Sequence, residues 1–168
     1  MGILNIDSLA RIKHSELVKL GARWLRNHKK HTTKIPRCPQ VAEELVTLTR
    51  TGEQPDIVGW NYWCSIMIEV KVTRRDFNKD KYKPFRQQPS LGTGQLKYYL
   101  APRCLIKTSD LPKNWGLLEI DTAKRITVKQ FAEFEDCNLD SERTMLVSAL
   151  RRQDKELKKL RTQLKKLS

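Results

Sequence analysis

The sequence contains no long apolar run, and this absence limits where the chain can act. No stretch approaches the ~18 residues that a membrane-spanning helix needs. The N-terminus, MGILNIDSLARIK, lacks the basic segment and apolar core of a secretory signal, and Ile6 stands where a myristoylation signal has Ser or Thr. We therefore expect a cytoplasmic protein without a membrane partner.

Cysteine and histidine are also scarce. The four cysteines lie far apart without a C-x-x-C pair, and the three histidines form no H-E-x-x-H pattern. These absences disfavour a zinc ribbon, a redox dithiol and a zinc hydrolase site. We expect the cysteines to be reduced and most of them to pack in the interior.

Positive charge is abundant. Lys and Arg number 33 against 19 Asp and Glu, which gives a formal net charge of +14. Such an excess favours a polyanionic partner through counterion release. The length of 168 residues suits one globular domain with an appended element, and we place the domain at residues 1–139 and a helical tail at 140–168.

Apolar spacing predicts an α/β domain. Residues 15–27 repeat apolar positions at helical spacing behind Ser15 as N-cap, and residues 41–49 are rich in β-branched side chains. Turn residues then separate two strands at 56–60 and 63–73. Residues 74–94 are polar and suit a short helix with a loop, or a flap. The remaining predictions are strands at 95–101 and 115–121, a short helix within 104–111, and an edge strand at 125–130.

The strand at 63–73 carries the candidate chemistry. Side chains alternate between the two faces of a strand. One face therefore receives Ile66, Ile68, Val70 and Val72, and the other receives Met67, Glu69, Lys71 and Thr73. Glu69 and Lys71 then stand side by side, either as a local ion pair on a half-solvated strand or as a catalytic pair.

Asp56 favours the catalytic interpretation. It lies thirteen residues before Glu69, at the mouth of the adjoining strand. Two carboxylates and one backbone carbonyl, that of Val70, form an oxygen-only site of the kind that Mg²⁺ or Mn²⁺ accepts. A neighbouring Lys71 can orient or help to deprotonate an attacking water and offset charge on a reacting phosphate.

Pro55-Asp56 followed by Glu69-Val70-Lys71 resembles the signature of the PD-(D/E)XK nuclease superfamily. The order of elements, a helix, three strands, a helical or irregular segment and another strand, is similar to that family's core over about residues 9–130. The resemblance implies a restriction-endonuclease-like mixed sheet flanked by helices. It also implies a Mg²⁺-dependent endonuclease that hydrolyses phosphodiester bonds of DNA, with Asp56, Glu69 and Lys71 as catalytic residues.

The resemblance extends to two further features. Gln95 and Tyr99 match the Q-x-x-x-Y element of repair-type members, which supports the metal site and the substrate backbone. The family also places an acidic residue before the PD motif, and here either Glu44 or Glu16 can fill that role. We prefer Glu44 as the additional metal ligand.

A run of cations follows the candidate strand directly. These residues would lie beside the scissile phosphate and hold the DNA strand. They are Arg74, Arg75, Lys79, Lys81, Lys83 and Arg86. Two other functions remain open: a nucleic-acid-binding oligomer with a degenerate metal site, and an adaptor that recruits an unrelated partner.

The C-terminal segment contains a heptad pattern. Leucines and one glutamine follow each other at steps of four and three, at positions 146, 150, 153, 157, 160, 164 and 167. A strict seam of this kind suits a self-associating coiled coil better than a helix that lies on its own domain. With Leu157 at an a position, Glu156 falls at g and Arg161 at the following e, which would help a parallel dimer. We expect a homo-oligomer that binds DNA.

Overall fold

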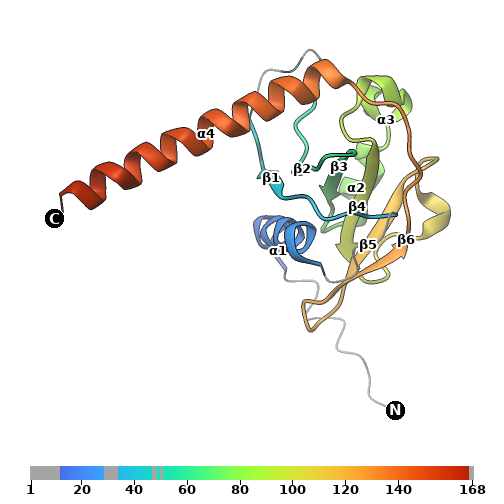
Figure 1. Cartoon of the computed structure of the whole chain (residues 1–168). Coiled ribbons are helices and arrows are strands. Elements are labelled where there is room, and N and C mark those ends of the chain that lie inside the picture. Colours follow the sequence, from blue (N-terminus) through green and yellow to red (C-terminus); the bar gives the residue numbers. More distant parts are fainter. Residues whose placement is uncertain (1–11, 29–33, 47–48, 50, 167–168) are drawn as a thin grey trace.

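Six strands form one mixed β-sheet and lie side by side in the order of the sequence (Figure 1). The strands are β1 (Gln40–Glu43), β2 (Ile57–Trp60), β3 (Ser65–Val70), β4 (Leu96–Pro102), β5 (Gly116–Ile120) and β6 (Ile126–Gln130). The first three are antiparallel, β3, β4 and β5 are parallel, and β6 returns antiparallel to β5. The computed structural model describes residues 12–28, 34–46, 49 and 51–166. The predicted α/β fold is confirmed at this level.

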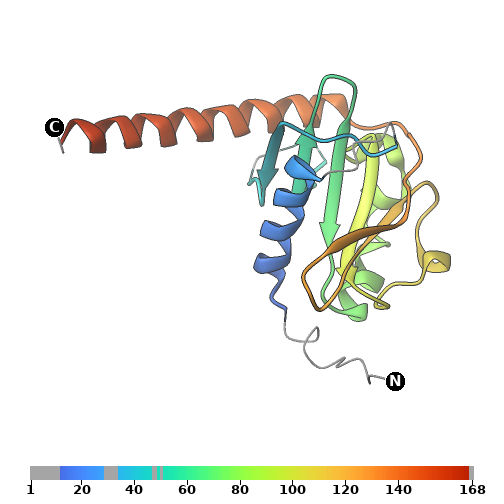
Figure 2. The ribbon, with the colours of Figure 1, turned by 60° about the horizontal axis from the view of Figure 1, so that its bottom comes forward.

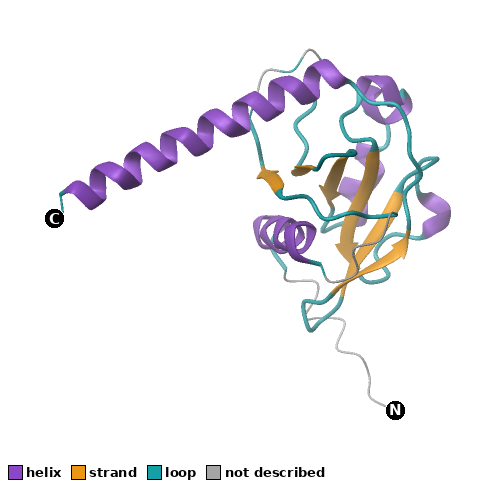
Figure 3. Cartoon of the chain, viewed as in Figure 1, coloured by secondary structure: helices purple, strands orange, loops and turns teal. Residues whose placement is uncertain are grey.

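Helix α1 (His14–Asn27) covers one face of the sheet (Figure 3). Its periodic residues, among them Leu17, Val18 and Leu25, are buried in the largest core cluster together with Ile66 and Ile68 of β3. The N-cap is Lys13, two residues before the predicted Ser15, and it makes no side-chain capping bond. The predicted alternation of β3 is confirmed: its isoleucines face α1, and Met67 belongs to the cluster on the other face.

The polar segment 74–94 forms the crossover between parallel strands β3 and β4. It contains α2 (Arg74–Asp80), α3 (Pro84–Gln87) and a single 3₁₀ turn, η2 (Pro89–Leu91). Thr73 caps α2 by accepting a hydrogen bond from the Asp76 backbone N–H. Phe77 of α2 packs on the second face of the sheet against Tyr99. Parallel neighbours require a crossover of this length, and it carries several polar side chains to the carboxyl end of β3.

Two predicted elements differ from the structure. The strand expected at 41–49 comprises only Gln40–Glu43, because Glu44 adopts a positive φ of 43° and Val46 is 82% exposed. The Glu44 N–H donates to the carbonyl of Asp56, which closes this end of the β1–β2 ladder. Residues 47, 48 and 50 lie outside the described part of the chain. Between 104 and 111 the structure has a 3₁₀ turn, η3 (Thr108–Asp110), where a short helix was expected.

Helix α4 (Leu139–Lys165) begins on the domain and then projects away from it (Figures 1 and 2). Asn138 caps it, with the side-chain oxygen accepting from the Ser141 N–H at 2.8 Å. Met145 and Ala149 are buried against β1 and β2. From Leu150 to Lys165 every residue is exposed. Among the helices that the structure describes, none has the length and hydropathy needed to cross a membrane.

Candidate active site

The two halves of the sequence motif meet at one end of β2 and β3. These strands are antiparallel, with Ile57 opposite Ile68, so Asp56 lies beside the end of β3. The backbone N–H of Val70 donates a hydrogen bond of 2.7 Å to Asp56 Oδ2. The spacing of thirteen residues therefore brings Asp56 next to Glu69, as the sequence predicts.

Glu69 and Lys71 form a buried ion pair. Lys71 Nζ donates to Glu69 Oε1 at 2.9 Å, and the two residues are 4% and 7% exposed. Burial raises the pKa of Glu69 in spite of the nearby Arg86 and Lys71 charges. Burial would lower the pKa of Lys71, but the Glu69 and Asp80 carboxylates outweigh it and raise that pKa. The Lys71 ammonium is accordingly held charged at neutral pH.

Asp80, at the end of α2, contacts several polar side chains of this site at once. Its Oδ2 accepts hydrogen bonds from Tyr99 Oη and Arg86 Nε, each at 2.8 Å. Its Oδ1 lies 3.3 Å from Lys71 Nζ and 2.7 Å from Lys83 Nζ. Burial would raise the pKa of Asp80, but the Arg86 and Lys71 charges dominate and lower it below its usual range.

Arg86 is internal, which corrects its predicted role as a DNA-contacting residue. Its side chain is 1% exposed and lies among three carboxylates, with its NH2 group 3.1 Å from Glu69 Oε2. It also pairs with Asp80 and with Glu53, whose second oxygen accepts from the Thr93 N–H at 2.6 Å. A guanidinium in this position cannot reach a phosphate without leaving partners that it needs for burial. We name the group of three carboxylates and three cations the ionic cluster: Glu53, Glu69, Asp80, Lys71, Lys83 and Arg86.

Tyr99 and Gln95 both make contacts within the protein, and the burial of Tyr99 leaves it no exposed surface for nucleic acid. Tyr99 is fully buried, stacks on Trp115 with ring centroids 4.6 Å apart, and donates its hydroxyl to Asp80. It supports the ionic cluster through this hydrogen bond to Asp80. Gln95 Oε1 accepts from the N–H of Ser65, at the opposite end of β3 from Glu69.

His14, the first residue of α1, was not identified from the sequence. Its Nε2 lies 3.3 Å from Asp56 Oδ2, and its Nδ1 lies 3.8 Å from Glu44 Oε1. Glu44 thus lies on the Asp56 side of the site, with its side chain 58% exposed. Glu16, the other candidate, is paired with Lys124 at 2.6 Å. No periodicity in the sequence distinguishes His14 from an ordinary helix start.

Of the remaining predicted cations, some make contacts within the protein and others are exposed. Arg74 bridges Asp110 and the carbonyl of Leu105, so it ties α2 to the loop after β4. Lys81 is partly buried beside the Phe77 ring. Lys83 stays 45% exposed while it contacts Asp80. Arg75 and Lys79 are exposed on α2.

The donor set fits a small, hard cation in part. Asp56 and Glu69 supply carboxylate oxygens of the kind Mg²⁺ prefers, and the buried Glu69 Oε2 accepts no hydrogen bond. That oxygen faces Arg86, and within the described ranges no group of three or more His, Cys, Asp or Glu side chains is arranged to hold a metal ion. A bound ion would therefore rest on two carboxylates and keep several waters.

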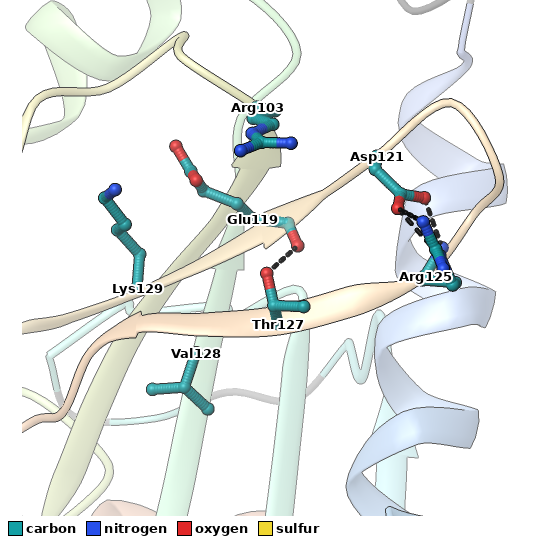
Figure 4. A pocket seen from close by; sticks show the side chains of 7 residues that line it. All are labelled: Arg103, Glu119, Asp121, Arg125, Thr127, Val128 and Lys129. Carbon is teal, nitrogen blue, oxygen red and sulfur yellow. Dashed lines mark hydrogen bonds and ion pairs between the residues drawn. The ribbon is translucent and has the colours of Figure 1, made fainter.

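A separate hollow of about 430 Å³ lies over β5 and β6 (Figure 4). It combines both signs of charge, and Asp121 is engaged by Arg125 at 2.8 Å. Glu119 accepts from the Cys104 N–H at 3.0 Å. None of its lining residues belongs to the ionic cluster; they are Arg103, Glu119, Asp121, Arg125, Thr127, Val128 and Lys129.

Comparison with known proteins gives one structural likeness. No family model matches the chain, and no curated protein matches it. The solved structure of SPO1766, a protein of unknown function from Silicibacter pomeroyi, superposes with a TM-score of 0.62 and 22% sequence identity. The match covers 90% of this chain and 93% of that one. It establishes a shared fold.

Proposed function

We propose that this chain is a Mg²⁺- or Mn²⁺-dependent deoxyribonuclease with a restriction-endonuclease-like core, and that it cuts DNA internally. The observation that carries the proposal is the hydrogen bond from the Val70 N–H to Asp56, which joins the PD and E-x-K halves of the motif beside Lys71. The order of α1, three antiparallel strands, a helical crossover and a parallel β4 supports the same proposal.

Each residue then has a distinct task. Asp56 and Glu69 would hold the ion, with the carbonyl of Val70 as a third oxygen and Glu44 on the Asp56 side. When bound, Mg²⁺ polarises a phosphoryl oxygen and lowers the pKa of a coordinated water. Lys71, kept protonated by Glu69 and Asp80, offsets the negative charge that develops on the phosphate, and its raised pKa makes it a poor general base.

Arg75, Lys79 and Lys83 would position the DNA backbone. They belong to the crossover that follows β3, and they are the exposed cations of this segment. Contacts of this kind fix the register of a duplex and carry no sequence information. Exposed cations would thus provide the affinity for DNA, and buried groups would carry out the chemistry.

One observation favours a second candidate, a nucleic-acid-binding module without cleavage. The Arg86 guanidinium lies 3.1 Å from Glu69 Oε2, where it can replace a metal ion as the counter-charge. In a degenerate site the arginine would hold the carboxylate permanently. DNA binding through the basic surface would persist.

Cleavage assays separate the two candidates. Purified chain is incubated with supercoiled plasmid and with a branched synthetic duplex in Mg²⁺, in Mn²⁺ and with a chelator. The proposal predicts nicked or linear products that require the metal. Salt-dependent binding without products would favour the binding module, and the absence of both would favour an adaptor that recruits another protein.

A further inference from the structure

Helix α4 presents two different stripes of side chains, and only one of them packs on the domain. The docked stripe carries Met145 and Ala149. At about 100° per residue, this stripe continues through Arg152 and Glu156, which are polar. Arg152 makes a hydrogen bond of 3.1 Å to the carbonyl of Glu43. The docked stripe therefore stops being apolar at the point where the helix leaves the sheet.

The leucines lie on the other stripe, roughly a quarter turn away from the docked one. Leu150, Leu157 and Leu160 are 52%, 53% and 50% exposed. Because they are not the continuation of the docked face, packing on the helix's own domain does not account for them. The heptad seam is therefore an apolar stripe that the helix's own domain leaves half exposed.

The projecting part of the helix is sixteen residues long, from Leu150 to Lys165, and all of it is exposed. A helix of this length without tertiary cover is marginal in water even for favourable sequences. An apolar seam at steps of three and four supplies the missing stabilisation when a second helix with the same spacing covers it.

We propose that the seam is covered by the same seam of a second copy of this chain, in a parallel, in-register coiled coil. The proposal does not depend on nuclease activity. Three features of the seam make it self-complementary. Leucines meet at equivalent positions, Glu156 at g faces the partner's Arg161 at e, and Gln153 meets its own copy. A glutamine side chain both donates and accepts hydrogen bonds, so two Gln153 side chains satisfy each other only when the copies are in register. Single polar residues within a seam specify register in this way.

The cations of the projecting helix lie mostly outside the seam, so pairing of two seams does not bring them face to face. The outward positions carry Arg151, Lys155, Lys158 and Lys159, so unpaired approach is repulsive. Lys158 is already neutralised in part by Asp154 of its own helix at 2.8 Å. Parallel pairing turns these cations outward, where a polyanion can reach them.

Molar mass in solution tests the proposal. Light scattering is measured on nucleic-acid-free full chain, on Leu157→Glu and on the matched control Thr162→Glu, which adds the same charge on the outer side of the helix. We expect an integral multiple of the single-chain mass for the wild type and the control, and the single-chain mass for Leu157→Glu. Thermal unfolding of the domain checks that both variants fold, since neither position is buried. A monomeric wild type, or equal masses for the two variants, would overturn the proposal.

A cysteine pair tests the parallel register independently. In a parallel coil, Leu157→Cys faces its own copy across the seam, and Thr162→Cys does not. Under mild oxidation we expect the first variant to form disulfide-linked dimers at least tenfold faster than the second. Equal rates would refute in-register pairing.

Discussion

Lys71 is held between Glu69 and Asp80, and in the proposed function it supplies the positive charge that offsets charge developing on the phosphate. We expect Lys71→Ala to lower the cleavage rate by on the order of a hundredfold or more, as removal of one positioned catalytic group does. Lys83→Ala is the matched comparison, because Lys83 contacts the same two carboxylates but is far more exposed. Single-turnover rates should fall much less for Lys83→Ala. Equal losses would mean that Lys71 only balances charge.

Asp80 links the ionic cluster to the stability of the domain. Removing its charge leaves Arg86 and Lys71 short of a buried partner, so Asp80→Asn should cost about 3–5 kcal/mol at pH 7. Because the pKa of Asp80 is lowered in the folded state, the folded protein binds fewer protons than the unfolded chain at acidic pH. This contribution is complete above the unfolded pKa of about 4 and is lost as the pH falls toward the folded value.

Thermal unfolding of the wild type and Asp80→Asn between pH 6 and pH 3 measures this linkage. The difference between the two melting temperatures should stay constant down to about pH 4 and shrink below it. A constant difference across the range would show that Asp80 acts through packing alone. The isosteric Asp136→Asn serves as a control, because it removes the same charge at an exposed residue outside the cluster.

The crossover between β3 and β4 divides its cations between the interior and the surface. Replacing Arg75 and Lys79 with Ala should weaken DNA binding and flatten its log-log salt dependence by about 0.9 for each phosphate that the protein no longer neutralises. The paired control replaces Lys19 and Arg23, two exposed cations of α1 on the opposite face of the sheet. Binding isotherms at several salt concentrations measure this slope for each variant. If both double variants flatten the slope equally, the DNA does not follow α2.

The same crossover marks the limit of what the sequence could predict. Strand alternation placed Glu69 beside Lys71, and motif spacing placed Asp56 beside both, because these relations follow from local geometry. Arg86 looked like any other cation of its segment, since its burial depends on where α3 meets Glu53, far away in sequence. Residues 41–49 read as a strand from composition, but pairing with β2 stops at Glu43, where Ile57 begins its partner. Tertiary contacts determine both the burial of Arg86 and the end of β1.

Residues outside the ionic cluster hold its members in place through a series of hydrogen bonds that reaches helix α4. Glu142 of α4 accepts hydrogen bonds from Ser65 Oγ at 2.6 Å and from the Gly94 N–H at 2.7 Å. The adjacent Thr93 bonds to Glu53, which pairs with Arg86. The docked start of α4 thus supports the loop that supports the cluster, and the coiled-coil seam begins on the same helix.

The proposed function requires Asp56, Glu69 and Lys71 to form a metal-dependent site that cuts DNA. The most direct test is the rate of duplex cleavage in Mn²⁺ by the wild type and by Glu69→Gln, measured with DNA binding on the same preparations. Glu16→Gln is the matched control, because it removes an equal charge from α1 at a residue paired with Lys124. We predict cleavage by the wild type and the control, and none by Glu69→Gln, which should bind DNA as tightly or more tightly. Equal cleavage by the wild type and Glu69→Gln would contradict it.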